Sequence, residues 1–240
     1  MKIGIISDIH ANLEALEAVL NALDKENVDR LICLGDIVGY GPDPNVCIDK
    51  VMSATDVVIA GNHDQGVVGL TSLEHFNENA RLALEWSIDK IEPHLLDALA
   101  TLPIIHEENT FLAVHATPND PTQWHYLFSE AQIVNNLDAM TLPLCFVGHS
   151  HVPVAFVLDP DHDILVQEAT DVRFQSGRKY LINVGSVGQP RDGDPRAAYG
   201  IYEEDRFCLK RADYDVALVQ KRMRIHHLPI HLIERLSIGQ

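Results

Sequence analysis

The stretch KIGIISDIHANLEALEAVL, residues 2–20, decides the start of the fold. Its first residues, from Lys2 to Ile6, are rich in isoleucine and predict a β-strand. A helix is indicated next, because leucines recur at spacings of three and four residues and so share one face: Leu13, Leu16, Leu20 and Leu23. Asn12 is a plausible N-cap for this helix. A strand followed directly by an amphipathic helix is typical of an α/β protein.

The same alternation continues along the chain. We expect a second strand from Arg30 to Leu34, the Gly- and Pro-rich loop GDIVGYGPDP at 35–44, a short helix from about Asn45, and a third strand from Asp56 to Ile59. Strands that alternate with helices predict a parallel sheet with helices packed on it.

The second half is rich in strand-like segments. After helical patterns over about 77–100, apolar segments follow at 103–107, 110–114, 143–147, 153–158, 164–167, 179–184, 198–203 and 206–211. We therefore expect a single domain over residues 1–240, a four-layer αββα sandwich with two packed mixed sheets and a site at the carboxyl ends of its strands. From Asp213 the pattern is helical and then becomes a tail with His and Pro, to which the sequence assigns no chemistry.

The net charge is strongly negative. Lys and Arg number 18 against 35 Asp and Glu, a formal charge of −17, so long nucleic acids are expected to be repelled. No apolar run approaches the roughly 20 residues of a membrane-spanning helix, and no signal peptide is expected. The cysteines form no C-x-x-C pair and are expected to be reduced thiols of a cytoplasmic protein: Cys33, Cys47, Cys145 and Cys208.

Residue types that bind metals follow five of the predicted strands. These segments are Asp8-Ile-His10, Gly35-Asp36, Gly61-Asn62-His63-Asp64, Val114-His115 and Gly148-His149-Ser150-His151. In D-x-H and H-x-H an extended backbone would project both side chains to the same side. One such segment is more often a turn or a cap, but five in one chain favour a metal site. A set of nitrogen and oxygen donors suits Mn, Fe, Zn, Ni or Mg.

The order of these segments is specific. D-x-H, GD, GNHD, H and GHSH between residues 8 and 151 resemble the signature of the calcineurin-like metallophosphoesterase superfamily, and NVGSVGQPRD at 183–192 extends the resemblance. SDIHAN, GDIVGYGPDP and HATPNDPTQWHYL are similar to a bacterial branch of small phosphoesterases. One departure is Ala116, which follows His115 where the family commonly has glycine and would be strained at a positive φ.

The resemblance implies two divalent metal ions, with Mn preferred, and a metal-bridging hydroxide that attacks phosphorus. It implies that one ion is held by Asp8, His10, Asp36 and His151, and the other by Asp36, Asn62, His115 and His149. Asp36 would bridge the two. His63 matches the family histidine that stabilises the transition state and can protonate the leaving oxygen, and Asp64 would orient its ring.

The expected substrate is a small phosphorylated molecule, either a nucleotide phosphodiester or a dinucleoside polyphosphate. Asn12 and Arg191 are candidates for contacting it, and three aromatic residues beside ligand segments could stack a nucleobase: Tyr40, Trp124 and Tyr126. Alternatives are a protein Ser/Thr phosphatase, a general phosphomonoesterase, a nuclease, which the charge disfavours, or a metal-binding interaction scaffold without catalysis.

Overall fold

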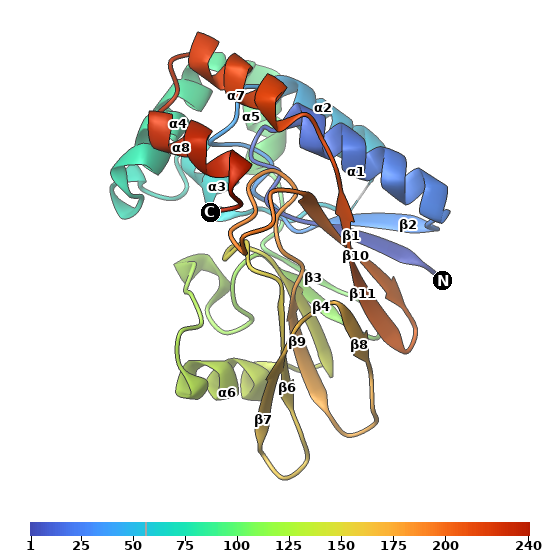
Figure 1. The fold of residues 1–240 in the computed structure, drawn as a ribbon. Helices are drawn as coiled ribbons and strands as arrows, with labels where there is room; N and C mark the ends of the chain where they lie inside the picture. Colours follow the sequence, from blue (N-terminus) through green and yellow to red (C-terminus); the bar gives the residue numbers. More distant parts are fainter. Residues whose placement is uncertain (56) are drawn as a thin grey trace.

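The computed structural model describes residues 1–55 and 57–240, and shows two mixed β-sheets with helices outside them (Figure 1). The first sheet has the order β2-β1-β10-β11-β8 and the second the order β3-β4-β5-β9-β6-β7. The strands are β1 (Ile3–Ile6), β2 (Arg30–Cys33), β3 (Ile105–Glu107), β4 (Leu112–Val114), β5 (Leu144–Val147), β6 (Val154–Leu158), β7 (Ile164–Gln167), β8 (Asp171–Arg173), β9 (Lys179–Asn183), β10 (Ala197–Glu203) and β11 (Arg206–Ala212).

Helices cover the outer face of each sheet. The helices are α1 (Leu13–Glu26), α2 (Pro44–Ala54), α3 (Asn62–Val67), α4 (Glu78–Lys90), α5 (Pro93–Ala100), α6 (Glu130–Ala139), α7 (Val216–Ile225) and α8 (Ile230–Glu234), with short 3-10 turns η1 (Leu73–His75), η2 (Pro121–Gln123) and η3 (Arg235–Ser237). Helix α1 buries Leu16 and Leu23 of the predicted leucine face on the first sheet, and α6 packs Ile133 and Leu137 on the second. The predicted four-layer αββα arrangement is confirmed.

The alternation of side chains along the strands separates the layers. In β1, Ile3 and Ile5 point between the two sheets, while Ile6 packs under the helices. The space between the sheets is filled by aliphatic side chains together with a cluster of aromatic rings, including Phe146 and Phe207. All four expected strands from 143–147 to 179–184 are present, as are those at 198–203 and 206–211, with ends that differ by a residue or two.

Several elements differ from the sequence-based expectation. The third strand, expected from Asp56 to Ile59, is reduced to one bridge between Val58 and Cys33, and Asp56 itself lies outside the described residues. The helical region 77–100 is broken into α4 and α5, because Pro93 starts a new helix. Elements α3, α6 and β8 were not anticipated.

The C-terminal tail is folded onto the rest of the protein. Residues of α7, α8 and η3, among them Met223 and Leu236, are buried against Tyr40 and the α4 residues Ala80 and Ala83. Figure 1 shows this tail, in red, lying beside α3 and α4. The tail therefore reaches the loop between β2 and α2, where several candidate site residues lie.

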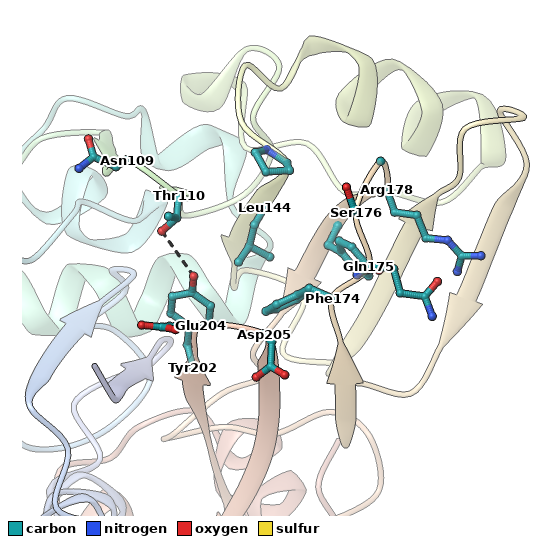
Figure 2. A pocket seen from close by; sticks show the side chains of 13 residues that line it. Asn109, Thr110, Leu144, Phe174, Gln175, Ser176, Arg178, Tyr202, Glu204 and Asp205 are labelled. Atoms are coloured by element: carbon teal, nitrogen blue, oxygen red, sulfur yellow. Dashed lines mark hydrogen bonds between the residues drawn. The ribbon is translucent and has the colours of Figure 1, made fainter.

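The two ends of the sandwich have different chemistry. A cavity of about 440 Å³ opens at one end, with Leu144, Phe174 and Tyr202 in its wall (Figure 2). No histidine among the described residues lines it. Strand β5 begins in this cavity at Leu144 and ends at Val147, directly before the predicted GHSH segment. None of the helices in the described parts of the chain is long and apolar enough to span a membrane.

Candidate metal centre

The candidate ligands converge at the carboxyl ends of strands from both sheets. Asp8 and Asp36 follow the parallel strands β1 and β2 of the first sheet, and His115 and His149 follow the parallel strands β4 and β5 of the second. All four side chains are buried, and so are the remaining candidates: His10, Asn62, His63, Asp64 and His151. Nine residues spread over 144 positions of sequence thus meet in one place, as the sequence predicts.

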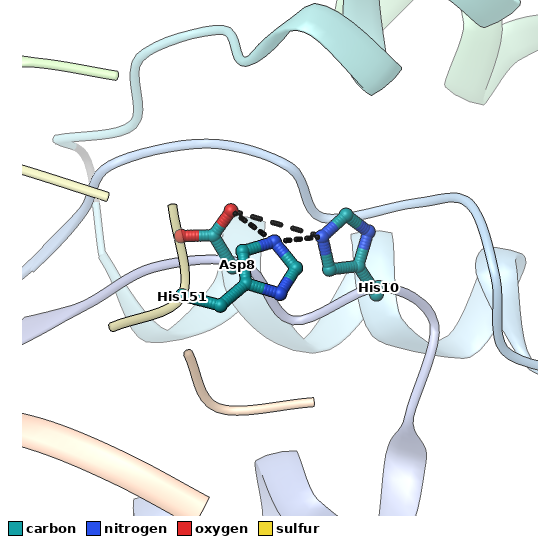
Figure 3. A group of neighbouring side chains, drawn as sticks. All are labelled: Asp8, His10 and His151. Carbon is teal, nitrogen blue, oxygen red and sulfur yellow. Dashed lines mark hydrogen bonds and ion pairs between the residues drawn. The ribbon is translucent and has the colours of Figure 1, made fainter. Parts of the chain in front are cut away.

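Asp8, His10 and His151 form a first group (Figure 3). The Nε2 atoms of His10 and His151 lie 3.0 Å apart, and the His151 Nε2 lies 3.1 Å from the Asp8 Oδ1. The His10 Nε2 is 3.7 Å from oxygens of both Asp8 and Asp36. Ring nitrogens and a carboxylate oxygen pointing at one location are the donor set of a divalent cation.

Asp36, His115 and His149 form a second group. The His115 Nε2 lies 3.3 Å from the Asp36 Oδ2, and a third combination, of His10, Asp36 and His63, joins this group to the first. Asp36 belongs to the second group and also lies 3.7 Å from the His10 Nε2 of the first, so its carboxylate lies between the two groups. The Asn62 side chain is buried beside them, and its Oδ1 has no hydrogen-bond partner among the described residues.

The outer nitrogens of the imidazoles are held by backbone carbonyls. The Nδ1 atoms of three rings pair with carbonyl oxygens, at 3.1 Å for His10 with Val38, 2.7 Å for His115 with Leu34 and 2.6 Å for His151 with Gln189. His149 instead pairs through its Nε2, at 2.9 Å from the carbonyl of Trp124. A carbonyl fixes the tautomer of the ring it accepts from, which leaves the other nitrogen with its lone pair free for a metal.

The backbone is not extended in the D-x-H and H-x-H segments, so the prediction that an extended backbone brings both side chains to the same side was wrong. Asp8 and His10 have φ of 55° and 50°, and His149 and His151 have φ of 65° and 61°. In each pair, left-handed residues stand on either side of a residue without a positive φ, Ile9 or Ser150, and both side chains still reach the same centre. Such conformations cost about 1–3 kcal/mol each in non-glycine residues, which is typical of functional sites.

Two glycines of the motifs are required by close contacts. A Cβ at Gly61 would lie 2.1 Å from the Asp36 Oδ1, and one at Gly148 would lie 2.4 Å from the Asp8 Oδ2. Both carboxylates occupy the space that a side chain would fill. Ala116, by contrast, is buried and has no positive φ, so the strain that a positive φ would cause at this departure from the family is absent.

The donor chemistry fits divalent cations. Buried Asp8 Oδ1 and His115 Nε2 have no hydrogen-bond partner among the described residues, which would be costly unless another group satisfies them. Burial lowers the pKa of His149 to about 4 and that of His151 to about 3, so both rings are neutral, the form in which imidazole can bind a metal. Burial lowers the pKa of His115, but the carboxylate of Asp36 raises it to about 10. The electrostatic field at this position therefore strongly attracts cations.

Asp64 does not orient the ring of His63, contrary to the expectation. Its carboxylate accepts hydrogen bonds from the backbone N–H groups of Asp36, Ile37 and Gly61 at 2.8, 2.9 and 3.0 Å. GNHD is also not a loop, because Asn62 begins α3 and the Asp64 carboxylate accepts from the N–H of its N-cap residue, Gly61. Burial, with the charge of Asp36, raises the pKa of Asp64 to about 7, and the N–H donors oppose this. Asp64 therefore positions the Asp36 loop.

His63 faces a cavity of about 400 Å³ next to the two groups. Its ring packs 4.6 Å from that of Tyr40, and Trp124, Tyr126 and Asn62 share the cavity wall. The predicted aromatic residues therefore do lie around the candidate centre. Tyr126 stacks on the ring of His149, one of the candidate ligands, with the ring centroids 4.2 Å apart.

The two predicted substrate-binding residues differ in their surroundings. Asn12 is buried and its amide is fully engaged, since Oδ1 caps α1 at the N–H of Ala15 and Nδ2 donates to the carbonyl of Gly188. Arg191 donates to the hydroxyl of Tyr40 at 3.2 Å, at the edge of the cavity. Arg235, from the C-terminal tail, was not anticipated from the sequence, and its guanidinium lies 5.3 Å from the Tyr40 ring centroid.

These features define an αββα protein whose candidate metal centre lies at the carboxyl ends of strands from two facing sheets, where α/β proteins usually bind their ligands. The model of the calcineurin-like phosphoesterase superfamily domain matches residues 1–206. The chain belongs to this superfamily and is a phosphoric ester hydrolase.

Individual relatives agree with this assignment. The structure of a metallophosphoesterase from Sphaerobacter thermophilus is similar with a TM-score of 0.89 and 40% identity, over 100% of both chains. The uncharacterized protein MJ0912 of Methanocaldococcus jannaschii is 41% identical over 99% of this chain and 98% of its own length. Phosphodiesterase YfcE of Escherichia coli is 25% identical over 85% of this chain and 89% of its own.

Proposed function

We propose that the protein, acting as one domain, hydrolyses a nucleotide-type phosphodiester or dinucleoside polyphosphate with the aid of two divalent cations. The observation that carries this proposal is the pair of adjacent ligand groups, one with Asp8 and His10 and the other with Asp36, whose carboxylate also approaches His10. Two groups with a carboxylate between them are suited to two cations about 3.5–4 Å apart.

The ligand assignment follows from the donors on each side of Asp36. The first cation would be held by Asp8, His10, Asp36 and His151, and the second by Asp36, Asn62, His115 and His149. When bound, the cations supply an acidified water as the nucleophile and neutralise charge on the phosphoryl oxygens. Mn suits this mixed nitrogen and oxygen set, as do Fe, Zn, Ni and Mg.

His63 is proposed as the catalytic residue that the substrate contacts. Its backbone N–H is fixed by the Asp36 Oδ1 at 2.8 Å, and its ring is clamped between Tyr40 and Phe76, at 4.6 and 5.1 Å. The ring lies in the cavity wall and its Nδ1 has no partner among the described residues. A neutral imidazole held there can donate its N–H to the leaving oxygen.

The nucleotide preference rests on the aromatic loop from Trp124 to Phe128. Phe128 is 84% exposed and stacks on Tyr126 at 5.4 Å with 20° between the planes, and Tyr126 continues the stack onto His149. A ring exposed to this extent next to a phosphate-cleaving centre is available to stack a nucleobase. Asn12, whose amide is engaged, is proposed to order the loop beside the centre, and Arg191 to contact the substrate.

Turnover by metal-stripped protein tests the proposal. The protein is supplied in turn with Mn, Ni, Zn and Mg, and assayed on p-nitrophenyl phosphate, its bis ester, dinucleoside polyphosphates and a phosphopeptide. The expected result is metal-restored hydrolysis that is fastest on the nucleotides. Equal or faster hydrolysis of the phosphopeptide would favour a protein phosphatase instead, and no hydrolysis with any metal would favour a binding scaffold.

A further inference from the structure

Two arginines lie together at the rim of the candidate centre. The guanidinium carbons of Arg191 and Arg235 lie 5.9 and 5.3 Å from the centroid of the same Tyr40 ring. Both also donate to the side-chain oxygen of Gln189, Arg191 at 3.2 and 3.3 Å. The two side chains reach this point from segments 44 residues apart in sequence.

Neither arginine is neutralised by an acidic side chain in the described parts of the chain. The ion pairs of the protein involve other arginines, such as Arg222 and Arg206, although acidic residues outnumber basic ones by 35 to 18. The Nε of Arg235 is buried without a hydrogen-bond partner among these residues. Two like charges held side by side with only a neutral amide between them are stabilised by an anion that joins both.

The arginine pair is connected directly to the candidate ligands. Gln189 holds both guanidinium groups with its side chain, while its backbone carbonyl lies 2.6 Å from the Nδ1 of His151. The Tyr40 ring under the arginines stacks 4.4 Å from the ring of His10. An anion on the arginine pair would therefore lie beside a phosphoryl group held at the first ligand group.

Arg235 comes from a part of the chain that the superfamily model does not cover. That model ends at residue 206, whereas Arg235 lies in η3 at the end of the folded tail. Gln189 also donates to the carbonyl of the last residue, Gln240, so the tail is fixed at this point from both sides. The fold of the tail thus brings one additional cation to the centre.

We propose that Arg191 and Arg235 form a subsite for a second phosphate group of the substrate, one that is not itself attacked. The inference rests on the proposed function and narrows its substrate class to molecules with more than one phosphate group. A planar guanidinium binds phosphate through two parallel hydrogen bonds, and two of them suit the dispersed charge of a di- or polyphosphate chain. Arg235 is a specificity-determining residue for substrates with more than one phosphorus atom.

The test compares two substrates with the same nucleosides, diadenosine monophosphate and diadenosine tetraphosphate, on the Mn-loaded protein. For Arg235→Ala we expect kcat/KM to fall about 10- to 100-fold on the tetraphosphate, and less than threefold on the monophosphate. Arg224→Ala is the matched control, since it removes an exposed arginine from α7 of the same tail and should change neither value. Equal losses on both substrates, or none, would overturn the proposal.

A binding measurement separates this inference from the proposed function. Calorimetry on the same proteins with inorganic tripolyphosphate and orthophosphate should show that the wild type prefers tripolyphosphate at least tenfold. Arg235→Lys, which keeps the positive charge over Tyr40 and so protects the fold, should lose most of this preference because an ammonium cannot bind two oxygens in parallel. An unchanged preference in Arg235→Lys and Arg235→Ala would contradict the subsite even if catalysis is confirmed. If the wild type prefers tripolyphosphate as expected but hydrolyses no substrate, only the proposed function is contradicted.

Discussion

The Nε2 atoms of His10 and His151 lie 3.0 Å apart in a buried pocket, although the two residues are separated by 141 positions in sequence. Each ring has its other nitrogen committed to a backbone carbonyl, at 3.1 Å for His10 and 2.6 Å for His151. Two ring nitrogens whose lone pairs face one another repel, unless a proton or a metal ion lies between them. A metal ion bound between these two rings would therefore stabilise the folded protein as well as serve catalysis.

Metal removal is therefore expected to destabilise the protein. At a concentration of free Mn about 100 times the dissociation constant, binding to the folded state contributes about 2.7 kcal/mol per site. For a chain of this size that corresponds to a rise in Tm of about 5–10 °C. Scanning calorimetry of chelator-treated protein with and without Mn measures the shift. Asp36→Asn should reduce the metal content, and a Tm independent of metal would contradict the assignment.

The second prediction concerns His63. Substitution by Ala should lower kcat about 10²- to 10⁴-fold, because a group that donates to the leaving oxygen is lost, while the metal content should stay unchanged. His75→Ala is a suitable control, since His75 lines the same cavity but lies outside the ligand groups. Steady-state kinetics with metal analysis of each variant gives the answer. A loss of metal that parallels the loss of activity would assign His63 to binding instead.

The sequence was sufficient to predict that the candidate ligands converge, but not to predict their local backbone geometry. Motif position predicts that Asp8 and His149 each lie at the carboxyl end of a parallel strand, although these two strands belong to different sheets. The left-handed backbone at both residues is invisible in a D-x-H or H-x-H pattern. The contact of Asp64 with the Asp36 loop was missed because it joins segments 28 residues apart in sequence.

The contacts of the tail could not be predicted for a different reason. Arg235 meets Gln189 across 46 residues, and only the packing of Leu236 and Met223 on α4 brings them together. The spacing of apolar residues in the sequence does not predict a contact of this kind. The helix α6, by contrast, had a readable start in Ser129 and Gln132, which form a capping box.

The third prediction follows from the role of Asp64 as an acceptor for the loop of Asp36. Asp64→Asn places an NH₂ group against backbone N–H donors, so at least one hydrogen bond to Ile37 or Gly61 is lost. Because this residue positions a ligand, we expect metal affinity to fall about 10- to 100-fold. Titration of metal-free protein with Mn measures it. Activity at saturating metal should recover to a larger extent than in Asp36→Asn, and a complete loss at all metal concentrations would disprove a purely positioning role.

The fourth prediction concerns Arg222, which holds α7 to the body of the protein. It donates to the Glu14 carboxylate at 2.6 Å and also to that of Asp43, and these carboxyl side chains are 13% and 9% exposed. Arg222→Ala leaves both acids without their cation, and we expect the free energy of unfolding to fall by about 2 kcal/mol. Arg224→Ala, on an exposed part of the same helix, should have almost no effect.

The pH dependence of this loss of stability shows whether Arg222 acts through its charge or through the packing of its side chain. Burial raises the pKa of Asp43 to about 6, and Arg222 opposes the rise. Because the folded-state pKa exceeds the unfolded value of about 4, the contribution of this carboxyl to stability is fully present below pH 4 and is lost as pH rises through 6. Removing Arg222 raises the pKa further, so Arg222→Ala should be more destabilising at pH 8 than at pH 5 in urea unfolding. An equal loss at both pH values would assign the effect of Arg222 to packing of its alkyl chain.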